Sequence, residues 1–393
     1  MLGKSRNILF VSITSTLLTG FVMISFIKKN NHSDKEPKKE IIDSFIRVSI
    51  VVAGDAMAHY PQITSAYNDT NKDYDFYPVF QYISPVIKKF DFSIVNYETT
   101  AGGKPYTGYP QFSAPDTLAY IIKDAGFKFF VNANNHSVDK GLKGITNTID
   151  VFDKYNIPHT GTFKDEASRN EVYPSIQVIN GLKIAILNYT YGTNGLFIPE
   201  PTIVNTIDTN VIKVDLKKAL DSIPDAVVVC MHWGIEYQRE PNQEQINLAN
   251  FLFENGADVI VGSHPHVIQP LELTTFNYKN KSKTGLIIWS LGNFVSNQRK
   301  QYTNGGIMVD FTLEKNKFTN TLKIKEVGYI PFWVYKTAKP EKFYILPICL
   351  FENDTTIFKL NNTDKTAFET FIKDTRSHLK RDTLNIKEYF PTN

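Results

Sequence analysis

Short apolar stretches recur along the chain, and many of them end in the same way. "IRVSIVVAGD", "DFSIVNYETT" and "FKFFVNANNH" each begin with a β-branched or aromatic run and end in polar or charged residues. "LKIAILNYT", "DAVVVCMHWGIEY", "ADVIVGSHPHVIQP" and "TGLIIWSLGNFVSN" follow the same design. Because the apolar runs do not alternate with polar residues, they predict strands of a sheet that is covered on both faces.

Stretches with helical spacing separate several of these predicted strands. "PDTLAYIIKDAG", "GLKGITNTIDVFDKYNI" and "NQEQINLANFLFENG" place apolar residues three or four positions apart. Strands that alternate with helices are typical of an α/β fold with helices on both faces of the sheet. After Gly305, "GGIMVDFTLEK" and "LKIKEVGYIPFWVYK" predict further strands, and "KTAFETFIKDTRSHLK" predicts a closing helix.

The N-terminal segment has a different character from the rest of the chain. Residues 8–27 are mostly apolar and have basic residues on both sides, and about 20 such residues can span a bilayer. No Ala-x-Ala site follows, so residues 1–29 predict a signal-anchor, with a cleaved signal peptide as the alternative. We therefore expect a protein of the cell membrane with a single N-terminal anchor and an extracytoplasmic body, or a secreted protein if the segment is cleaved.

The remaining boundaries follow from changes in composition. Residues 30–46 are polar and charged, which predicts a flexible linker. Residues 47–310 hold the strands with polar ends and form the main predicted domain. Residues 311–393 supply the last strands and the helix that complete it.

Charge and cysteine content exclude several classes of protein. The net charge is only +3, and Lys and Arg are scattered along the chain, so nucleic acid is not an expected partner. The two cysteines, Cys230 and Cys349, lie in apolar runs and form no Cys-x-x-Cys motif. A disulfide framework or a cysteine metal site is therefore not expected.

Histidines concentrate where the predicted strands end. Five of the eight histidines follow predicted strands closely, together with Asp55, Glu98 and Asn135; they are His59, His136, His232, His264 and His266. In open α/β sheets, ligands bind beyond the carboxyl ends of the strands. Carboxylates, an amide oxygen and imidazoles form a mixed ligand set that suits Mn, Fe or Zn. The sequence thus predicts a site for one or two divalent transition metal ions.

Two motifs contribute most of this chemistry. In "GSHPHV", a turn around Pro265 would direct His264 and His266 toward different ions, although a surface turn would explain the motif alone. In "NANNHSVDKG", Asn135 would offer its amide oxygen to a metal and His136 would act as a general acid oriented by Asp139. A turn that caps the next helix is the alternative for the two asparagines.

Other candidates have simpler alternatives. Asp55 could serve only as a helix N-cap, and His59 would either reach the same metal as Asp55 or lie on a helix face. Glu236 follows His232 by four residues and is a further candidate acid or base.

Six motifs in this order resemble the CapA family of capsule and poly-gamma-glutamate biosynthesis. They are "GDAMAH", "NYET", "NANNHSVDKG", "HWGIEY", "GADVIVGSHPHVIQP" and "SLGNF", between Val48 and Tyr335. That family is similar to the calcineurin-like metallophosphoesterases. The resemblance implies an α/β fold in which a β-sandwich is flanked by helices, a four-layer αββα arrangement.

The resemblance also implies a role for most of the candidate residues. Asp55 matches the aspartate that holds metal A, and Glu98 stands where a bridging carboxylate is expected, with Asn96 as the competing candidate. Asn135 and His232 match ligands of metal B, and His136 matches the catalytic histidine. His264 and His266 match a histidine pair that serves one metal each.

The sequence departs from the superfamily pattern in three places. The expected Asp-x-His becomes Asp55 with His59 four residues later, the Gly-Asp bridge becomes "NYE", and Gly-Asn-His becomes "NNH". Glu236 has no counterpart in the pattern. The number and identity of the metals, and phosphoesterase activity itself, are therefore left open by the sequence.

Three functions follow from these observations. The first is a metal-dependent hydrolase that acts on a cell-envelope polymer or on its phosphorylated precursor, in capsule or poly-gamma-glutamate synthesis or export. The second is a non-catalytic export or assembly subunit, within a capsule-synthesis membrane complex. The third is a metal-dependent amidase that cleaves an envelope polymer.

Overall fold

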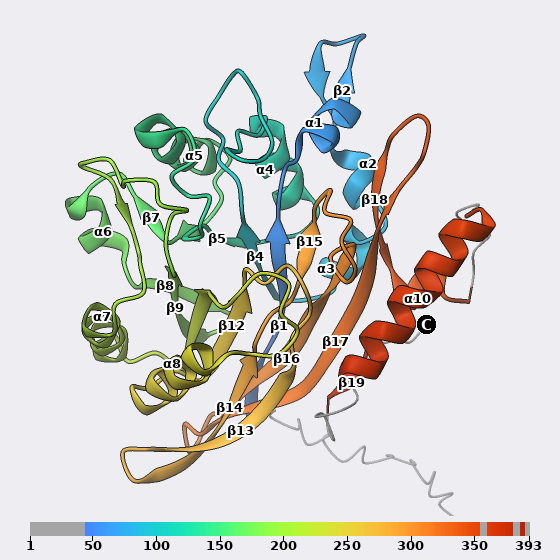
Figure 1. Cartoon of the computed structure of the whole chain (residues 1–393). Coiled ribbons are helices and arrows are strands. Elements are labelled where there is room, and N and C mark those ends of the chain that lie inside the picture. The colour runs from blue at the N-terminus through green and yellow to red at the C-terminus, as the bar shows by residue number, and fades with distance from the viewer. Residues whose placement is uncertain (1–43, 354–359, 380–385, 390–393) are drawn as a thin grey trace, which may run out of the picture. The chain divides into compact units, whose positions relative to one another are not determined.

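Two β-sheets face each other in the body of the chain (Figure 1). The computed structural model describes residues 44–353, 360–379 and 386–389. The predicted signal-anchor lies outside these residues. Within the described part of the chain, no helix is both long and apolar enough to cross a membrane.

The first sheet contains nine strands, and β1 lies near its middle. Its main path runs in the order β18 (Phe343–Pro347), β17 (Leu322–Lys336), β16 (Gly305–Asn316), β1 (Phe45–Ala56), β4 (Phe92–Tyr97), β5 (Phe129–Val131) and β6 (His159–Thr160). In addition, β15 (Asn293–Val295) pairs with β1, and β19 (Lys387–Glu388) pairs with β17.

The second sheet contains six strands. Its order is β13 (Leu271–Tyr278), β14 (Lys281–Ile288), β12 (Val259–Ser263), β11 (Ala226–His232), β9 (Leu182–Thr190) and β8 (Ser175–Ile179). Two small pairs stand apart from both sheets: β2 (Tyr67–Asn68) with β3 (Asp73–Tyr74), and β7 (Thr162–Phe163) with β10 (Ile203–Val204).

Successive strand residues point into different apolar cores. On β11, Val228 and Cys230 pack in the core between the sheets, whereas Val227 and Val229 pack against helices on the other face. Ile50 and Val51 divide in the same way on β1. Each strand therefore buries both faces, which is why its sequence is a continuous apolar run.

Helices cover the outer face of each sheet. The first sheet packs against α1 (Tyr60–Ala66), α2 (Tyr77–Phe80), α3 (Ser84–Ile87), α4 (Asp116–Asp124) and α5 (Gly141–Lys154). The second packs against α7 (Thr209–Asp221) and α8 (Gln243–Glu254), with α6 (Glu166–Val172) beside β7. This confirms the four-layer αββα architecture and three of the predicted helices.

The C-terminal part extends the first sheet. α9 (Ile348–Phe351) follows β18, and α10 (Asn362–Leu379) packs against β17 through Phe368 and Phe371. In Figure 1, α10 lies beside β17, away from the helices of the second sheet. Arg376 joins α10 to its neighbours through ion pairs with Glu352 and Glu388.

The strands that carry the candidate residues run in the same direction within each sheet. β1, β4 and β5 are parallel in the first sheet, and β9, β11 and β12 are parallel in the second. Their carboxyl ends consequently gather the polar residues that follow them at one edge of each sheet.

Candidate metal centre

Residues from both sheets converge on one buried carboxylate, Glu98. Asp55 near the end of β1 and Glu98 just after β4 come from the first sheet, while His232 ends β11 in the second. The possible ligand atoms of these three residues all lie within 4.8 Å of one another. All three side chains have 0% exposure, so the centre lies inside the protein.

A second group of ligand atoms shares Glu98 with the first. It adds His264 and His266, which follow β12. Oε1 of Glu98 lies 3.6 Å from Nε2 of His232 and 3.9 Å from Nε2 of His266. Glu98 belongs to both groups, so its carboxylate lies within reach of both sets of candidate ligand atoms.

Asn96, the competing candidate for the bridge, contacts two of the other candidates. Its Nδ2 donates to Oδ1 of Asp55 at 2.8 Å and lies 3.2 Å from Nδ1 of His232. The amide thus contacts one candidate ligand from each sheet.

Asn135 and His136 follow β5 and lie on the other side of the centre. Oδ1 of Asn135 is 2.9 Å from Nε2 of His232. Ligand atoms of one ion are about 3 Å apart, because each bond to the ion is near 2.1 Å. His136 is held by Asp139, whose Oδ2 lies 2.8 Å from its Nδ1 and also accepts from the backbone N–H of Phe112.

Besides Asn135, His136 and Asp139, two further candidates, His59 and Glu236, lie outside both ligand groups. His59 is at the N-cap of α1, where its Nδ1 lies 3.2 Å from Gln62 and accepts from the backbone N–H of Asn297. Glu236 lies on the exposed loop after β11, close enough to raise the pKa of the buried Glu98, although burial and Asp55 contribute more.

The family of the chain is settled by comparison with known proteins. The model of the family described as "Bacterial capsule synthesis protein PGA_cap" matches residues 49–298. The chain belongs to this family. The match covers Asp55 and all of the other candidate residues, and it confirms the resemblance drawn from the six motifs.

Two relatives of this PGA_cap chain carry matching names. The chain is 32% identical over 286 residues to "Capsule biosynthesis protein CapA" of Bacillus anthracis, covering 69% of this chain and 65% of that one. It is 30% identical over 249 residues to "PGA biosynthesis protein CapA" of Bacillus subtilis (strain 168), covering 61% and 62%. The match thus spans just under two thirds of the length of these relatives.

Two solved structures with a similar arrangement are described as a phosphoesterase and a phosphatase. The calcineurin-like phosphoesterase YfkN from Bacillus subtilis is 13% identical, with a TM-score of 0.43, and covers 86% of this chain and 100% of its own. A phosphatase from Mycoplasma pneumoniae is 15% identical, with a TM-score of 0.41, and covers 79% and 98%.

The unpartnered polar atoms of the PGA_cap centre fit a cation. Both carboxylate oxygens of Glu98 and Nδ1 of His264 are buried, and none of these three atoms has a hydrogen-bond partner. A buried polar atom without a partner is costly, and a metal ion would satisfy all three. Burial, followed by the neighbouring histidines, also lowers the pKa of His232, and it lowers that of His264 to about 3, which keeps both imidazoles neutral as metal binding requires.

The backbone at the histidine pair is strained in a way that suits this role. His264 and His266 have φ values of 100° and 60°, which residues other than glycine rarely adopt. Such conformations persist when the surrounding structure enforces them, and they concentrate at functional sites. The turn around Pro265 thereby presents both rings to Glu98.

Gly54 allows the end of β1 to approach the backbone of Gly292 closely, next to Asp55. A Cβ at position 54 would lie 2.0 Å from the carbonyl oxygen of Gly292, in the "SLGNF" motif. The same oxygen accepts from the backbone N–H of Asp55. Only a residue without a side chain permits this approach, which explains why Gly-Asp and "SLGNF" occur in one chain.

Tyr191 was not predicted from the sequence, although it lies over the centre. It directly follows β9, its ring centroid is 4.5 Å from that of His264, and its ring stacks on His232 at 6.3 Å. Its hydroxyl donates to Asn194, to which Asn135 also donates. The signal was present, because "LKIAILNYT" is a predicted strand and Tyr191 is the next residue.

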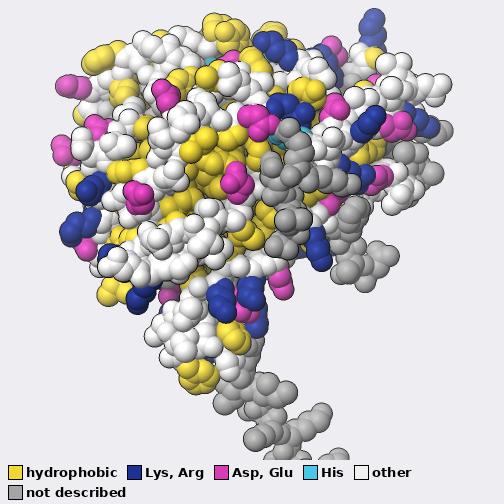
Figure 2. All heavy atoms as spheres, turned by 60° about the horizontal axis from the view of Figure 1, so that its bottom comes forward, with side chains coloured by type: hydrophobic (Ala, Val, Ile, Leu, Met, Phe, Trp, Pro, Cys, Tyr) yellow, Lys and Arg dark blue, Asp and Glu magenta, His cyan; other side chains and the backbone are white. Residues whose placement is uncertain are grey.

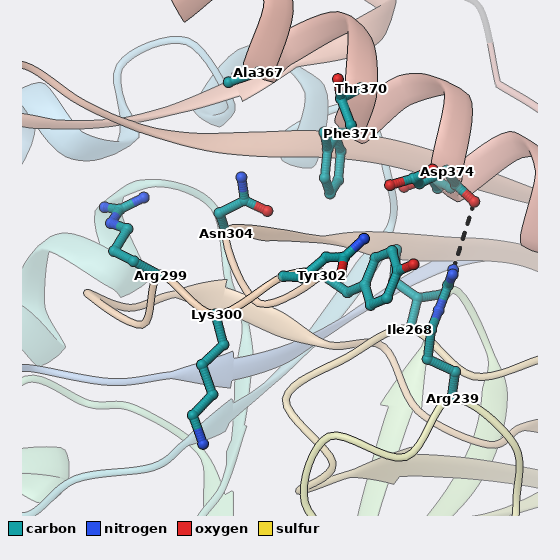
Figure 3. Close-up of a pocket in the computed structure, with 12 residues that line it drawn as sticks. Arg239, Ile268, Arg299, Lys300, Tyr302, Asn304, Ala367, Thr370, Phe371 and Asp374 are labelled. Carbon is teal, nitrogen blue, oxygen red and sulfur yellow. Dashed lines mark hydrogen bonds between the residues drawn. The ribbon is translucent and has the colours of Figure 1, made fainter.

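A separate cavity of about 200 Å³ lies between α10 and the loop after β15 (Figure 3). Arg239 lies over the ring of Tyr302 at 4.1 Å and donates to the backbone oxygen of Asp374. Lys300 points away from Phe371 and contacts the ring of Tyr237 at 3.8 Å. None of the candidate ligands lines this cavity, so it is distinct from the metal centre.

Proposed function

We propose that this chain is a metal-dependent hydrolase of the cell envelope. It acts in capsule, poly-gamma-glutamate or other envelope polymer synthesis or export, on the polymer or on its phosphorylated precursor. Membership in the capsule synthesis family supports a role in envelope polymer synthesis or export. The buried Glu98, which two groups of candidate ligands share, supports a metal-dependent reaction. A buried carboxylate without a hydrogen-bond partner is costly, and a cation would offset that cost.

The residues that would hold metal fall into two sets around Glu98. Asp55 and His232 belong to one set, and His264 and His266 to the other, with Asn135 beside His232. One or two divalent ions, of Mn, Fe or Zn, would supply Lewis-acid polarisation of the scissile phosphoryl or carbonyl group.

His136 is the proposed general acid. Its Nδ1 is engaged by Asp139, which fixes the orientation of the ring and leaves Nε2 for the substrate. The edge of the Phe112 ring packs on His136 at a centroid distance of 4.6 Å and limits rotation of the imidazole. A proton or hydrogen bond given to the leaving oxygen at this position typically contributes about 10² to 10⁴ in rate.

The proposed setting is the outer face of the cell membrane, to which the N-terminal segment would anchor the body. Envelope polymers and their precursors are accessible there. Other capsule-synthesis membrane proteins are the proposed partners, and the names of the two relatives support this setting.

The first prediction separates turnover from metal binding. His136→Ala should lower metal-dependent turnover at least tenfold while the metal content stays at the wild-type value, because His136 lies next to a ligand and is not one. Turnover is measured on phosphomonoesters, phosphodiesters and poly-gamma-glutamate, at matched metal occupancy determined by elemental analysis. His159→Ala is the matched control, since His159 lies on β6 outside the centre.

The class of substrate that the protein cleaves identifies its activity. Turnover of a phosphoester supports the phosphoesterase, and turnover of poly-gamma-glutamate alone identifies an amidase. The wild type could instead bind metal and cleave none of these substrates, while polymer export in cells still requires the protein. That result would contradict the hydrolase and support a non-catalytic role in export or assembly.

A further inference from the structure

A cleft lined by lysines lies at the opposite end of β1 from the metal centre. Lys279, Lys281 and Lys283 come from the hairpin between β13 and β14, and Lys323 comes from β17. Two aspartates also line the cleft, and each is already paired: Asp258 with Lys283 at 2.5 Å, and Asp225 with Lys315 at 2.7 Å. The cleft therefore presents an excess of positive charge, carried by the exposed side chains of Lys279, Lys281 and Lys323.

Exposed apolar side chains flank the same cleft. Phe318, in the turn between β16 and β17, is 76% exposed, and Ile223, two residues before Asp225, is 83% exposed. Figure 2 brings this end of the molecule toward the viewer and shows Lys and Arg side chains gathered in its lower part, next to apolar ones. Apolar side chains among lysines are typical of surfaces that lie at the interface of an anionic membrane.

The chain also enters the body at this end. Phe45, the first residue of β1, pairs with Asn316, and the backbone N–H of Lys317 donates to the carbonyl oxygen of Ser44. The apolar segment 8–27 therefore connects through residues 28–43 to the end that carries the lysines. Sixteen residues reach at most about 55 Å, so the body stays close to any membrane that holds the segment. Weak contacts then suffice to orient it.

We propose that the cleft of Lys279, Lys281, Lys283 and Lys323, with Phe318 and Ile223, docks the body on an anionic phospholipid surface. This inference rests on the anchoring in the proposed function and adds an orientation to it. Ten residues of β1 separate Phe45 from Asp55, which corresponds to about 33 Å. The docked body holds its metal centre at that distance from the lipid headgroups, facing away from the membrane.

Hydrogen exchange of the full-length chain in lipid nanodiscs tests the orientation. Discs that contain phosphatidylglycerol are compared with discs of phosphatidylcholine alone. Backbone amides in the two turns, residues 278–281 and 317–321, should exchange at least about threefold more slowly in the anionic discs. This protection should disappear at 0.5 M salt, where charge interactions at the surface are screened.

Two variants assign the protection to the cleft. Exchanging Lys279, Lys281 and Lys323 together for Gln should abolish it, and Phe318→Ser should reduce it without changing the charge. A matched triple exchange of Lys104, Lys143 and Lys213 for Gln removes the same charge from exposed positions elsewhere and should leave the protection intact.

Three results would overturn the inference. Equal exchange of the turns in both kinds of disc, from a chain that co-elutes with both, contradicts the docking but not the anchor. Protection by added poly-glutamate in phosphatidylcholine discs, with none from phosphatidylglycerol, shows that the cleft binds a soluble polyanion instead. A chain that co-elutes with neither disc contradicts the anchor of the proposed function and the docking with it.

Discussion

At the scale of single residues, two of the buried carboxylates in the described body have opposite surroundings. Glu98 has imidazoles on several sides, so a cation would compensate its charge. Asp310 on β16 differs: its Oδ1 is buried without a hydrogen bond, and the charge that acts on it is that of another carboxylate, Glu326. Burial, followed by Glu326, raises the pKa of Asp310 to about 7.

Asp310 should make the protein less stable as the pH rises. In the unfolded chain the carboxyl loses its proton near pH 3.8, whereas in the folded chain it does so near pH 7. The folded state therefore binds more protons between these values, and stability falls with rising pH across that window, by up to about 4 kcal/mol. Asp310→Asn should raise the melting temperature most at pH 8 and by a smaller amount at pH 5, where only part of this stability has been lost.

Thermal unfolding at the two pH values checks this prediction. Asp69→Asn, at an exposed position on the loop between β2 and β3, is the control and should behave as the wild type. A melting temperature of Asp310→Asn that is unchanged at pH 8 would show that the carboxyl is already protonated or solvated there.

The sequence indicated which residues gather at the centre, but not their individual contacts. Polar residues at the ends of apolar runs predicted Asp55, Glu98 and His232 because parallel strands bring their carboxyl ends together. The position of His59 depends on the chain after β1, which turns directly into the N-cap of α1. No pattern of residues encodes that turn, so the distance from His59 to the centre could not be predicted.

At the scale of elements, the path of β1 depends on its close approach to the loop before β15. Gly54→Ala would place a methyl group 2.0 Å from the carbonyl oxygen of Gly292, and the strand would have to move. Overpacking of this kind typically costs about 1 to 3 kcal/mol. We expect a lower melting temperature and, because Asp55 is the next residue, a lower metal content as well.

Gly192→Ala is the matched control, because a Cβ there would meet no atom within 4 Å. Melting curves of the two variants measure the change in stability, and elemental analysis measures the change in metal content. If Gly54→Ala retains both wild-type stability and wild-type metal content, the close approach does not position Asp55.

Strand and helix types were predictable, whereas the division into two sheets was not. The apolar runs at β1 and at β11 look alike in sequence, since both strands are covered on two faces. Nothing in such a run states which sheet it joins. The hairpin of β13 and β14 was also not predicted: after Leu271, β13 alternates between partly buried and exposed positions, so it lacks a continuous apolar run.

At the scale of the whole molecule, the centre joins the two sheets. Asp55 and Glu98 belong to the first sheet, and His232, His264 and His266 follow strands of the second. A cation held between them would bind only the folded arrangement. Bound metal therefore stabilises the fold as a whole, by about 2.7 kcal/mol when its free concentration is 100 times the dissociation constant.

A chelator should lower the melting temperature of the metal-loaded protein, and His264→Ala should remove most of that difference. The expected cause is the loss of a ligand from the group that shares Glu98. His159→Ala should keep the full chelator response even if its own melting temperature falls, because His159 lies outside the centre. A full response in His264→Ala would mean that this histidine is not a ligand.

The residues of the centre are also far apart in the sequence, so they leave the ribosome at different times. Asp55 emerges early from the ribosome, but its partner His266 follows 211 residues later, and the neighbouring strand β16 ends only at Asn316. Contacts between such distant parts of a chain form slowly. A nascent chain that stops short of His266 therefore lacks one of the candidate ligands, and a cation could meet the full set only after this residue has been made.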